Sequence, residues 1–153
     1  MNIMAKLVIV SCGSKKIWND NPSAGPTAAR DAYVSPYTNW LKSYPQKFKN
    51  DWFILSAKYG FIEPDFIIPE PYNLTFKDKS ARTISVEELR EQVRSKKLNR
   101  FDEIVVLGGK EYANRVRAAF AGTKCHVRAP VEGLPIGKIM KRVKESIIAA
   151  REL

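Results

Sequence analysis

LVIVSCGSKK, residues 7–16, passes from four consecutive apolar residues into a polar loop that contains two lysines. A short apolar run without alternation is typical of a strand that is buried on both faces of a sheet. Three other short runs are bounded by polar or glycine residues, and they span residues 52–55, 104–107 and 125–128. The sequence therefore predicts at least four strands, of which the first three are continuously apolar.

Helical patterns alternate with these strands. One helix is predicted to begin at Ser85, because Ser85 and Glu88 have the spacing of a capping box. The other helical patterns cover residues 29–44, 110–120 and 136–151. The first of these is the weakest, since Ser35-Pro36 interrupts it.

This alternation predicts the fold class. Strands that alternate with helices form a mostly parallel sheet covered by helices on both faces, so we expect one three-layer α/β domain over residues 1–153. Residues 60–83 are rich in proline and aromatic side chains and form a long connection in this scheme. A connection of that length in a compact domain is usually functional.

The composition fits a globular, cytoplasmic protein. The chain has 153 residues, 44% of them hydrophobic, and a chain of this length buries about two thirds of its unfolded surface. No apolar run reaches the roughly 18 residues that a bilayer span needs, and the start lacks the pattern of a signal peptide. We expect no membrane partner. Cys12 and Cys125 form no C-x-x-C pair and His126 lies in a strand pattern, so the sequence predicts no disulfide framework, metal site or cofactor.

The charge is strongly positive. Twenty-six lysines and arginines against 16 acidic residues give a formal net charge of +10. Such an excess favours a polyanionic partner, and we expect a nucleotide or nucleic acid. The alternative is that scattered lysines only keep the protein soluble.

Three predicted strands end in loops of similar chemistry, at residues 11–16, 56–60 and 108–110. A fourth loop, residues 133–138, opens the last helix. Ligands of open α/β sheets bind outside the carboxyl ends of the strands, where glycines permit close approach and lysines add positive charge. The alternative is that these glycines and prolines only form the tight turns and first turns at which helices begin, since no loop matches a full phosphate-loop motif. The predicted substrate-binding residues are Ser11, Cys12, Lys15, Lys16, Ser56, Gly60, Tyr72, Gly108, Gly109 and Lys138.

One segment also resembles a known family. LSAKYGFIEPDFIIPEPYNL, residues 55–74, is similar to the corresponding segment of the YaaA-like peroxide-stress family. SCGSKK, SAKYG and GLPIGK together resemble a related short bacterial domain-of-unknown-function family more closely. The resemblance implies a cytoplasmic α/β protein with a basic cleft that binds DNA. That cleft would be built around Ser56, Tyr59, Gly60, Asp65 and Tyr72. This chain is much shorter than the YaaA-like proteins, and their start differs from SCGSKK.

The predicted catalytic residues are Lys58, Tyr59 and Asp65. Lys58 has the charge to bind phosphate, and Tyr59 has a flat face that can stack on a base. Asp65, or Glu63 in its place, is predicted as a general base that activates water to cleave an N-glycosidic bond. The alternatives are that Tyr59 only packs under the long connection and that Asp65 caps a turn after proline.

Cys12 has two interpretations as well. Beside Lys15 it could be an activated thiolate, or it could be a small buried side chain. For the whole protein, two functions remain open: an enzyme that processes nucleotides or nucleobases, and a non-catalytic nucleic-acid-binding module. Only the enzyme needs a carboxylate inside the cleft, and only the module needs a continuous positive stripe.

Overall fold

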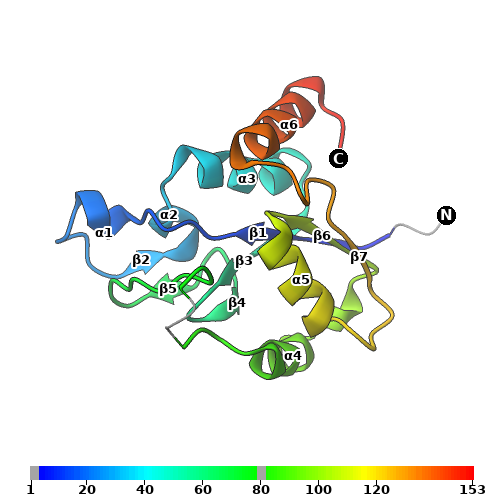
Figure 1. The fold of residues 1–153 in the computed structure, drawn as a ribbon, viewed down its shortest axis with the longest axis horizontal. Helices are drawn as coiled ribbons and strands as arrows, with labels where there is room; N and C mark the ends of the chain where they lie inside the picture. Colours follow the sequence, from blue (N-terminus) through cyan, green and yellow to red (C-terminus); the bar gives the residue numbers. More distant parts are fainter. Residues whose placement is uncertain (1–3, 79–81) are drawn as a thin grey trace.

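The computed structural model describes residues 4–78 and 82–153, and within them a five-stranded sheet forms the centre of the molecule (Figure 1). The strand order is β4-β3-β1-β6-β7. The strands are β1 (Lys6–Ser11), β3 (Asp51–Ser56), β4 (Gly60–Ile62), β6 (Glu103–Leu107) and β7 (His126–Arg128). β1, β3, β6 and β7 are parallel, whereas β4 runs antiparallel to β3. The predicted strands and the mostly parallel sheet are confirmed.

Helices cover both faces of this sheet. α3 (Pro36–Lys47) and α6 (Ile136–Ala149) lie together on one face, and α4 (Val86–Ser95) and α5 (Lys110–Ala119) lie on the other (Figure 1). Leu7 and Ile9 of β1 point into the core under α4 and α5, and Val8 and Val10 point into the core under α3 and α6. The continuous apolar run of β1 is therefore explained by burial on both faces, and the predicted three-layer fold is confirmed.

The break predicted at Ser35-Pro36 separates two helices. The first is the short α2 (Ala29–Ala32), and the second is α3, which begins at Pro36. The Ser35 side chain accepts a hydrogen bond from the Thr38 amide at 3.1 Å, so Ser35 is the N-cap and proline occupies the first turn. Two further short helices are α1 (Ile17–Asp20) and the 3-10 helix η1 (Leu98–Arg100).

The connection over residues 60–83 contains strands that the sequence did not predict. It begins with β4, and it continues with β5 (Ile67–Ile68), which pairs antiparallel with β2 (Thr27–Ala28) in a second, two-stranded sheet. These strands are too short for a hydrophobic period to indicate them. The expectation of a connection without strands was wrong for this part, and residues 79–81 lie outside the described residues.

The turn between β3 and β4 depends on Gly60. Its φ of +77° lies in the left-handed region, and a Cβ added there would lie 2.2 Å from Gln92 Oε1. Gln92 of α4 accepts a hydrogen bond from the Phe61 amide and donates one to the Tyr59 carbonyl, both at 2.8 Å. Gly60 is therefore required by the backbone and by the close approach of α4.

The predicted capping box of α4 is confirmed. Ser85 Oγ accepts from the Glu88 amide at 3.0 Å, and Glu88 Oε1 accepts from the Ser85 amide at 3.2 Å. We expect Ser85→Ala to lower the free energy of unfolding by about 1 kcal/mol, because an amide of the first turn loses its acceptor. Urea unfolding followed by circular dichroism measures the change. An unchanged midpoint would contradict a stabilising role for this cap.

None of the helices in residues 4–78 and 82–153 is both long and apolar enough to cross a membrane.

Candidate functional site

The loops after β1, β3 and β6 lie at the same edge of the sheet. In the parallel register Ser11 is opposite Leu55, and Val10 is opposite Leu107, so the three strands end side by side. This edge faces the part of the molecule that contains α1, α2 and the small β2–β5 sheet, at the left of Figure 1. We refer to the side chains gathered there as the strand-end cluster: Cys12, Lys16, Tyr33, Ser56, Lys58, Tyr59, Tyr72 and Tyr112.

Ser56 organises the β3 side of the strand-end cluster. It is fully buried, and its Oγ accepts hydrogen bonds from the Lys58 amide at 3.2 Å and the Tyr59 amide at 3.1 Å. The Tyr72 hydroxyl lies 2.9 Å from the same oxygen and is also hydrogen-bonded to the Tyr33 hydroxyl. One serine thus fixes the turn that follows β3 and connects it to the long connection, which explains the serine at this position.

Lys16 lies inside the strand-end cluster. The residue is 3% exposed, and its Nζ lies 4.5 Å from the centre of the Tyr72 ring and donates to the Ser14 carbonyl at 3.3 Å. Burial lowers the pKa of the Lys16 ammonium, and the neighbouring Cys12 opposes this effect. Within the described residues no carboxylate lies within ion-pair distance of Lys16. Its positive charge is therefore buried against aromatic rings without an acidic partner.

Lys58 approaches Tyr72 from the other loop. Its Nζ lies 5.7 Å from the centre of the Tyr72 ring and 5.4 Å from that of Tyr59. The Tyr59 and Tyr72 rings meet edge to face, with centroids 5.6 Å apart. Burial raises the pKa of Tyr72 to about 12, so its hydroxyl keeps its proton at neutral pH. The cluster therefore combines neutral phenols with two ammonium groups from different strand ends.

Cys12 is held by Tyr112, from the first turn of α5. The Cys12 sulfur lies 3.3 Å from the Tyr112 hydroxyl, which donates to the Cys12 carbonyl at 3.0 Å. Burial raises the pKa of the Cys12 thiol, and the hydrogen bond between Sγ and the Tyr112 hydroxyl and the charge of Lys16 only partly oppose this. The arrangement favours the buried-thiol interpretation over the activated thiolate.

We expect Cys12 to react with iodoacetamide at neutral pH about tenfold or more slowly than Cys125, because little of the Cys12 thiol is ionised and the residue is only 7% exposed. Cys125 is partly exposed and is the internal control. Mass spectrometry of timed digests measures both rates. Faster alkylation of Cys12 would restore the activated-thiolate interpretation.

Sequence reasoning missed three residues of this region: Tyr33, Lys42 and Tyr112. Lys42 of α3 is buried, and its Nζ donates to the Tyr33 carbonyl at 2.6 Å and to the Arg30 carbonyl at 2.7 Å, which anchors the end of α2. Lys42 and Tyr112 lie in helices, whereas Tyr33 follows α2 and pairs with Lys16 in an isolated bridge. None of the three belongs to a motif. The one available signal was a tyrosine in the first turn of the helix after Gly108-Gly109.

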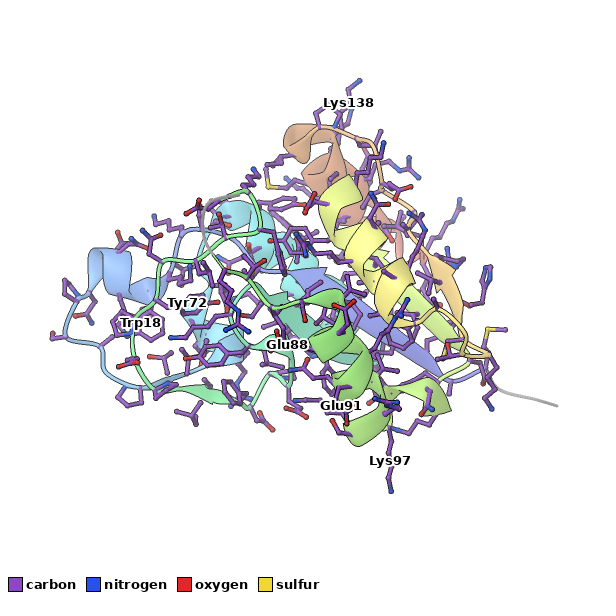
Figure 2. The ribbon with its side chains drawn as sticks, turned by 60° about the horizontal axis from the view of Figure 1, so that its bottom comes forward. Trp18, Tyr72, Glu88, Glu91, Lys97 and Lys138 are labelled. Atoms are coloured by element: carbon purple, nitrogen blue, oxygen red, sulfur yellow. The ribbon has the colours of Figure 1, made fainter. Side chains whose placement is uncertain are left out.

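Three predicted site residues lie apart from the strand-end cluster. Asp65 forms an ion pair with Arg30, and its side chain is 83% exposed. Lys15 is paired with Asp20 at 3.5 Å, on the surface. Lys138 is exposed near the start of α6, and Figure 2 shows it at the top of the view, far from Tyr72 and Trp18. The structure thus does not bring Asp65 into contact with Lys15 or Lys58. Glu63, the other predicted base, pairs with Lys96 at 3.5 Å.

Two hollows of the surface lie away from the strand-end cluster. One of about 590 Å³ lies between α4 and the end of α5, and is lined by residues such as Arg90, Arg94 and Lys124. A second, of about 310 Å³, lies near Lys6 and Glu152 at the opposite edge of the sheet. Neither is lined by a residue of the strand-end cluster, which the Tyr72 side chain helps to fill. In the described part of the chain, no three His, Cys, Asp or Glu residues are placed to hold a metal ion.

Comparison with known proteins gives a family but no activity. The model of a family of unknown function, DUF6884, matches residues 7–145. A protein of Bacillus subtilis (strain 168) named "Uncharacterized protein YfjM" is 36% identical over 151 residues, which cover 98% of this chain and all of the relative. No solved structure matches.

Proposed function

Because the chain belongs to the family of unknown function DUF6884, we propose a function from the strand-end cluster itself: the protein is an enzyme that processes a nucleotide or nucleobase and holds its phosphate-bearing ligand at the carboxyl ends of β1, β3 and β6. The observation that carries the proposal is the burial of Lys16 without a carboxylate partner among the described residues. A buried ammonium without a carboxylate partner is costly, and an anionic ligand removes that cost.

The aromatic side chains support a nucleotide rather than a simple anion. Tyr59 and Tyr72 present ring surface beside Lys16 and Lys58, so a ligand that carries both a flat base and a phosphate is complementary to the group. A ligand that contacts Lys16 would have to displace or slide past the Tyr72 ring, since Lys16 is only 3% exposed and its Nζ lies 4.5 Å from the centre of that ring. The proposal thus requires a movement of the connection that carries Tyr72.

The reaction that fits best is cleavage of an N-glycosidic bond. Water attacks the sugar carbon, the bond from that carbon to the base nitrogen breaks, and the departing base takes the bonding electrons and a proton. Lys16, whose pKa is lowered by burial, has the chemistry to supply that proton. Asp65 is retained as the general base that accepts the proton lost by the attacking water, which requires its carboxylate to leave Arg30.

One observation favours a second function, the non-catalytic nucleic-acid-binding module of YaaA-like type. Asp65 is exposed and ion-paired with Arg30, so it does not lie where a base would act on a ligand of the strand-end cluster. The net charge of +10 and the resemblance of residues 55–74 to the YaaA-like proteins support the same alternative.

The experiment that separates the two functions is a release assay. The protein is incubated with a panel of nucleosides, nucleoside monophosphates and short single-stranded DNA and RNA, and free base is measured by chromatography. The enzyme proposal expects base release that Asp65→Asn abolishes while ligand binding remains. The module expects no release and binding of the polymers only, with an affinity that falls steeply as salt rises. Absence of both release and binding would refute both functions.

We expect Lys58→Ala to weaken the binding of a nucleoside monophosphate by about 1.5 kcal/mol, the lower end of the range for a hydrogen bond to a charged group, because Lys58 is exposed. The melting temperature should stay nearly constant. Lys47→Ala, at an exposed lysine near the end of α3, is the matched control. A lower melting temperature with unchanged affinity would make Lys58 a structural residue.

A further inference from the structure

We propose that the phosphate of the ligand binds at the N-terminus of α5, between Ser11 at the end of β1 and Gly109. This position adjoins the strand-end cluster through Cys12 and Tyr112. The inference rests on the proposed function for the identity of the ligand as a phosphate ester, and it adds the place and the groups that hold the phosphate.

The first turn of α5 offers free amide donors. Gly109 is the N-cap and provides no side chain to cap the helix, and the first bond of the helix runs from the Ala113 amide to the Gly109 carbonyl at 3.1 Å. The amides of residues 110–112 therefore have no partner within the helix. A Cβ built on Gly109 would meet no atom within 4 Å, so there is open space beside the N-cap residue. Amides and the helix dipole together favour an anion there.

Ser11 supplies the second, independent observation. The residue is 2% exposed, and among the described residues its Oγ makes no hydrogen bond of normal geometry. Its polar neighbour is the Tyr37 phenol: burial raises the pKa of Tyr37, and a hydrogen-bonding interaction with Ser11, outside normal geometry, opposes this only in part. A Cβ on Gly108 would lie 2.9 Å from Ser11 Cβ and 3.1 Å from Ser11 Oγ, so the Ser11 side chain lies against the chain that leads into α5. A buried hydroxyl without a hydrogen bond of normal geometry is costly, and a phosphate oxygen in front of α5 is an acceptor that would satisfy it.

The surrounding charges fit a phosphate. Lys110 begins α5 and is exposed. Glu111, the acidic residue in the first turn, forms an ion pair with Arg115 of the next turn, with Oε1 and Nη2 2.8 Å apart. Glu132, on which Lys110 also acts, is paired with Arg117. The nearby carboxylates are therefore neutralised by arginines, and the lysine is left to meet an anion.

The site is also fixed before any ligand arrives. The Tyr112 hydroxyl donates to the Cys12 carbonyl at 3.0 Å, which ties the loop after β1 to the first turn of α5. Gly108 is required because a side chain there would collide with Ser11 Cβ at 2.9 Å. The absence of a side chain at both glycines thus serves different ends: close packing at Gly108 and open space at Gly109.

The decisive variant is Gly109→Asp. Aspartate is a preferred N-cap, so its carboxylate should bond the free amides of α5, keep or raise the melting temperature, and occupy the position of the phosphate. Calorimetric titration with inorganic phosphate should then show a loss of affinity of about tenfold or more, because the amides are taken and a negative charge is added. Gly137→Asp adds the same charge in the first turn of α6, where a Cβ meets no atom within 4 Å, and is the matched control.

Ser11→Ala tests the hydroxyl separately. Without phosphate we expect an unchanged or higher melting temperature, since an unsatisfied buried hydroxyl is removed, and with phosphate a loss of affinity of about tenfold. A lower melting temperature with unchanged affinity would overturn the assignment of Ser11. This variant also keeps the test valid if Gly109→Asp fails to fold.

The other outcomes separate this inference from the proposed function. If the wild-type protein binds no phosphate, or if Gly109→Asp leaves its affinity unchanged, the inference is overturned. Equal binding of acetate would overturn the choice of phosphate over a carboxylate. If phosphate and ribose phosphate bind as expected at α5 but no nucleotide is bound more tightly or processed, the proposed function fails and the phosphate site stands.

Discussion

Ser56→Ala is expected to lower the free energy of unfolding by about 2 to 4 kcal/mol, a large effect for the loss of one oxygen atom. Ser56 Oγ is the acceptor for two backbone amides, those of Lys58 and Tyr59, and it lies 2.9 Å from the Tyr72 hydroxyl. Since the serine is fully buried, water cannot replace the oxygen without a rearrangement of the turn. Two amides and one phenol would be left without this partner.

Chemical unfolding, followed by tyrosine and tryptophan fluorescence, measures the change. Ser23→Ala is the matched control, because Ser23 is exposed and its hydroxyl donates to the neighbouring Asn21 side chain. We expect the control to change stability by less than about 0.5 kcal/mol. Equal effects of the two variants would show that the Ser56 hydroxyl does not organise the strand-end cluster.

Lys16→Met is expected to have opposite effects on stability and on ligand binding. Without ligand, the variant should be more stable by about 1 to 3 kcal/mol, because a methionine fills similar space without a buried charge. With a nucleoside monophosphate, the affinity should fall by about 3 kcal/mol, the upper end of the range for a hydrogen bond to a charged group. Without ligand, Lys16→Met should therefore melt at a higher temperature than the wild-type protein. With enough ligand, the wild-type protein should melt at the higher temperature.

The gain in stability should depend on pH. The pKa of Lys16 is lowered in the folded protein from an ordinary value of 10.5, so between the two pKa values the unfolded chain binds more protons. Wild-type stability from this group thus rises as pH increases through that interval. The advantage of Lys16→Met should be full below the folded pKa of Lys16 and should shrink as pH rises from there toward 10.5.

Lys15→Met is the comparison for Lys16→Met. Lys15 is the preceding residue, carries the same charge, and pairs with Asp20 on the surface. We expect it to weaken binding by no more than about threefold, through long-range charge alone. A loss of stability in Lys16→Met, or equal losses of affinity in the two variants, would remove the observation on which the proposed function rests.

The fold was predictable because its signals are local. The apolar run of β1, the capping box at Ser85 and the break at Ser35-Pro36 each lie within a few neighbouring residues, and each produced the expected element. β5 was not predictable, because two residues carry no period and their pairing partner, β2, lies about 40 positions earlier.

The arrangement of the candidate site was less predictable, because it depends on contacts between distant segments. A lysine in a polar loop is normally exposed, whereas Lys16 is buried with its Nζ near the rings of Tyr33 and Tyr72. Asp65 follows a strand end and a proline, yet the partner that draws it to the surface, Arg30, is 35 residues away. The three lysine-containing strand ends could be grouped from the sequence only because parallel strands end at a common edge.

The two hydrogen bonds of the Gln92 side chain affect the exposed edge of the main sheet. β4 is an edge strand, and a free row of amides and carbonyls on an edge is a template on which another chain can add a strand. The Gln92 side chain binds the Phe61 amide and the Tyr59 carbonyl with the same kinds of group that a neighbouring backbone would use. A single residue of α4 therefore takes the place of the next strand, and the sheet is closed to intermolecular extension at this point.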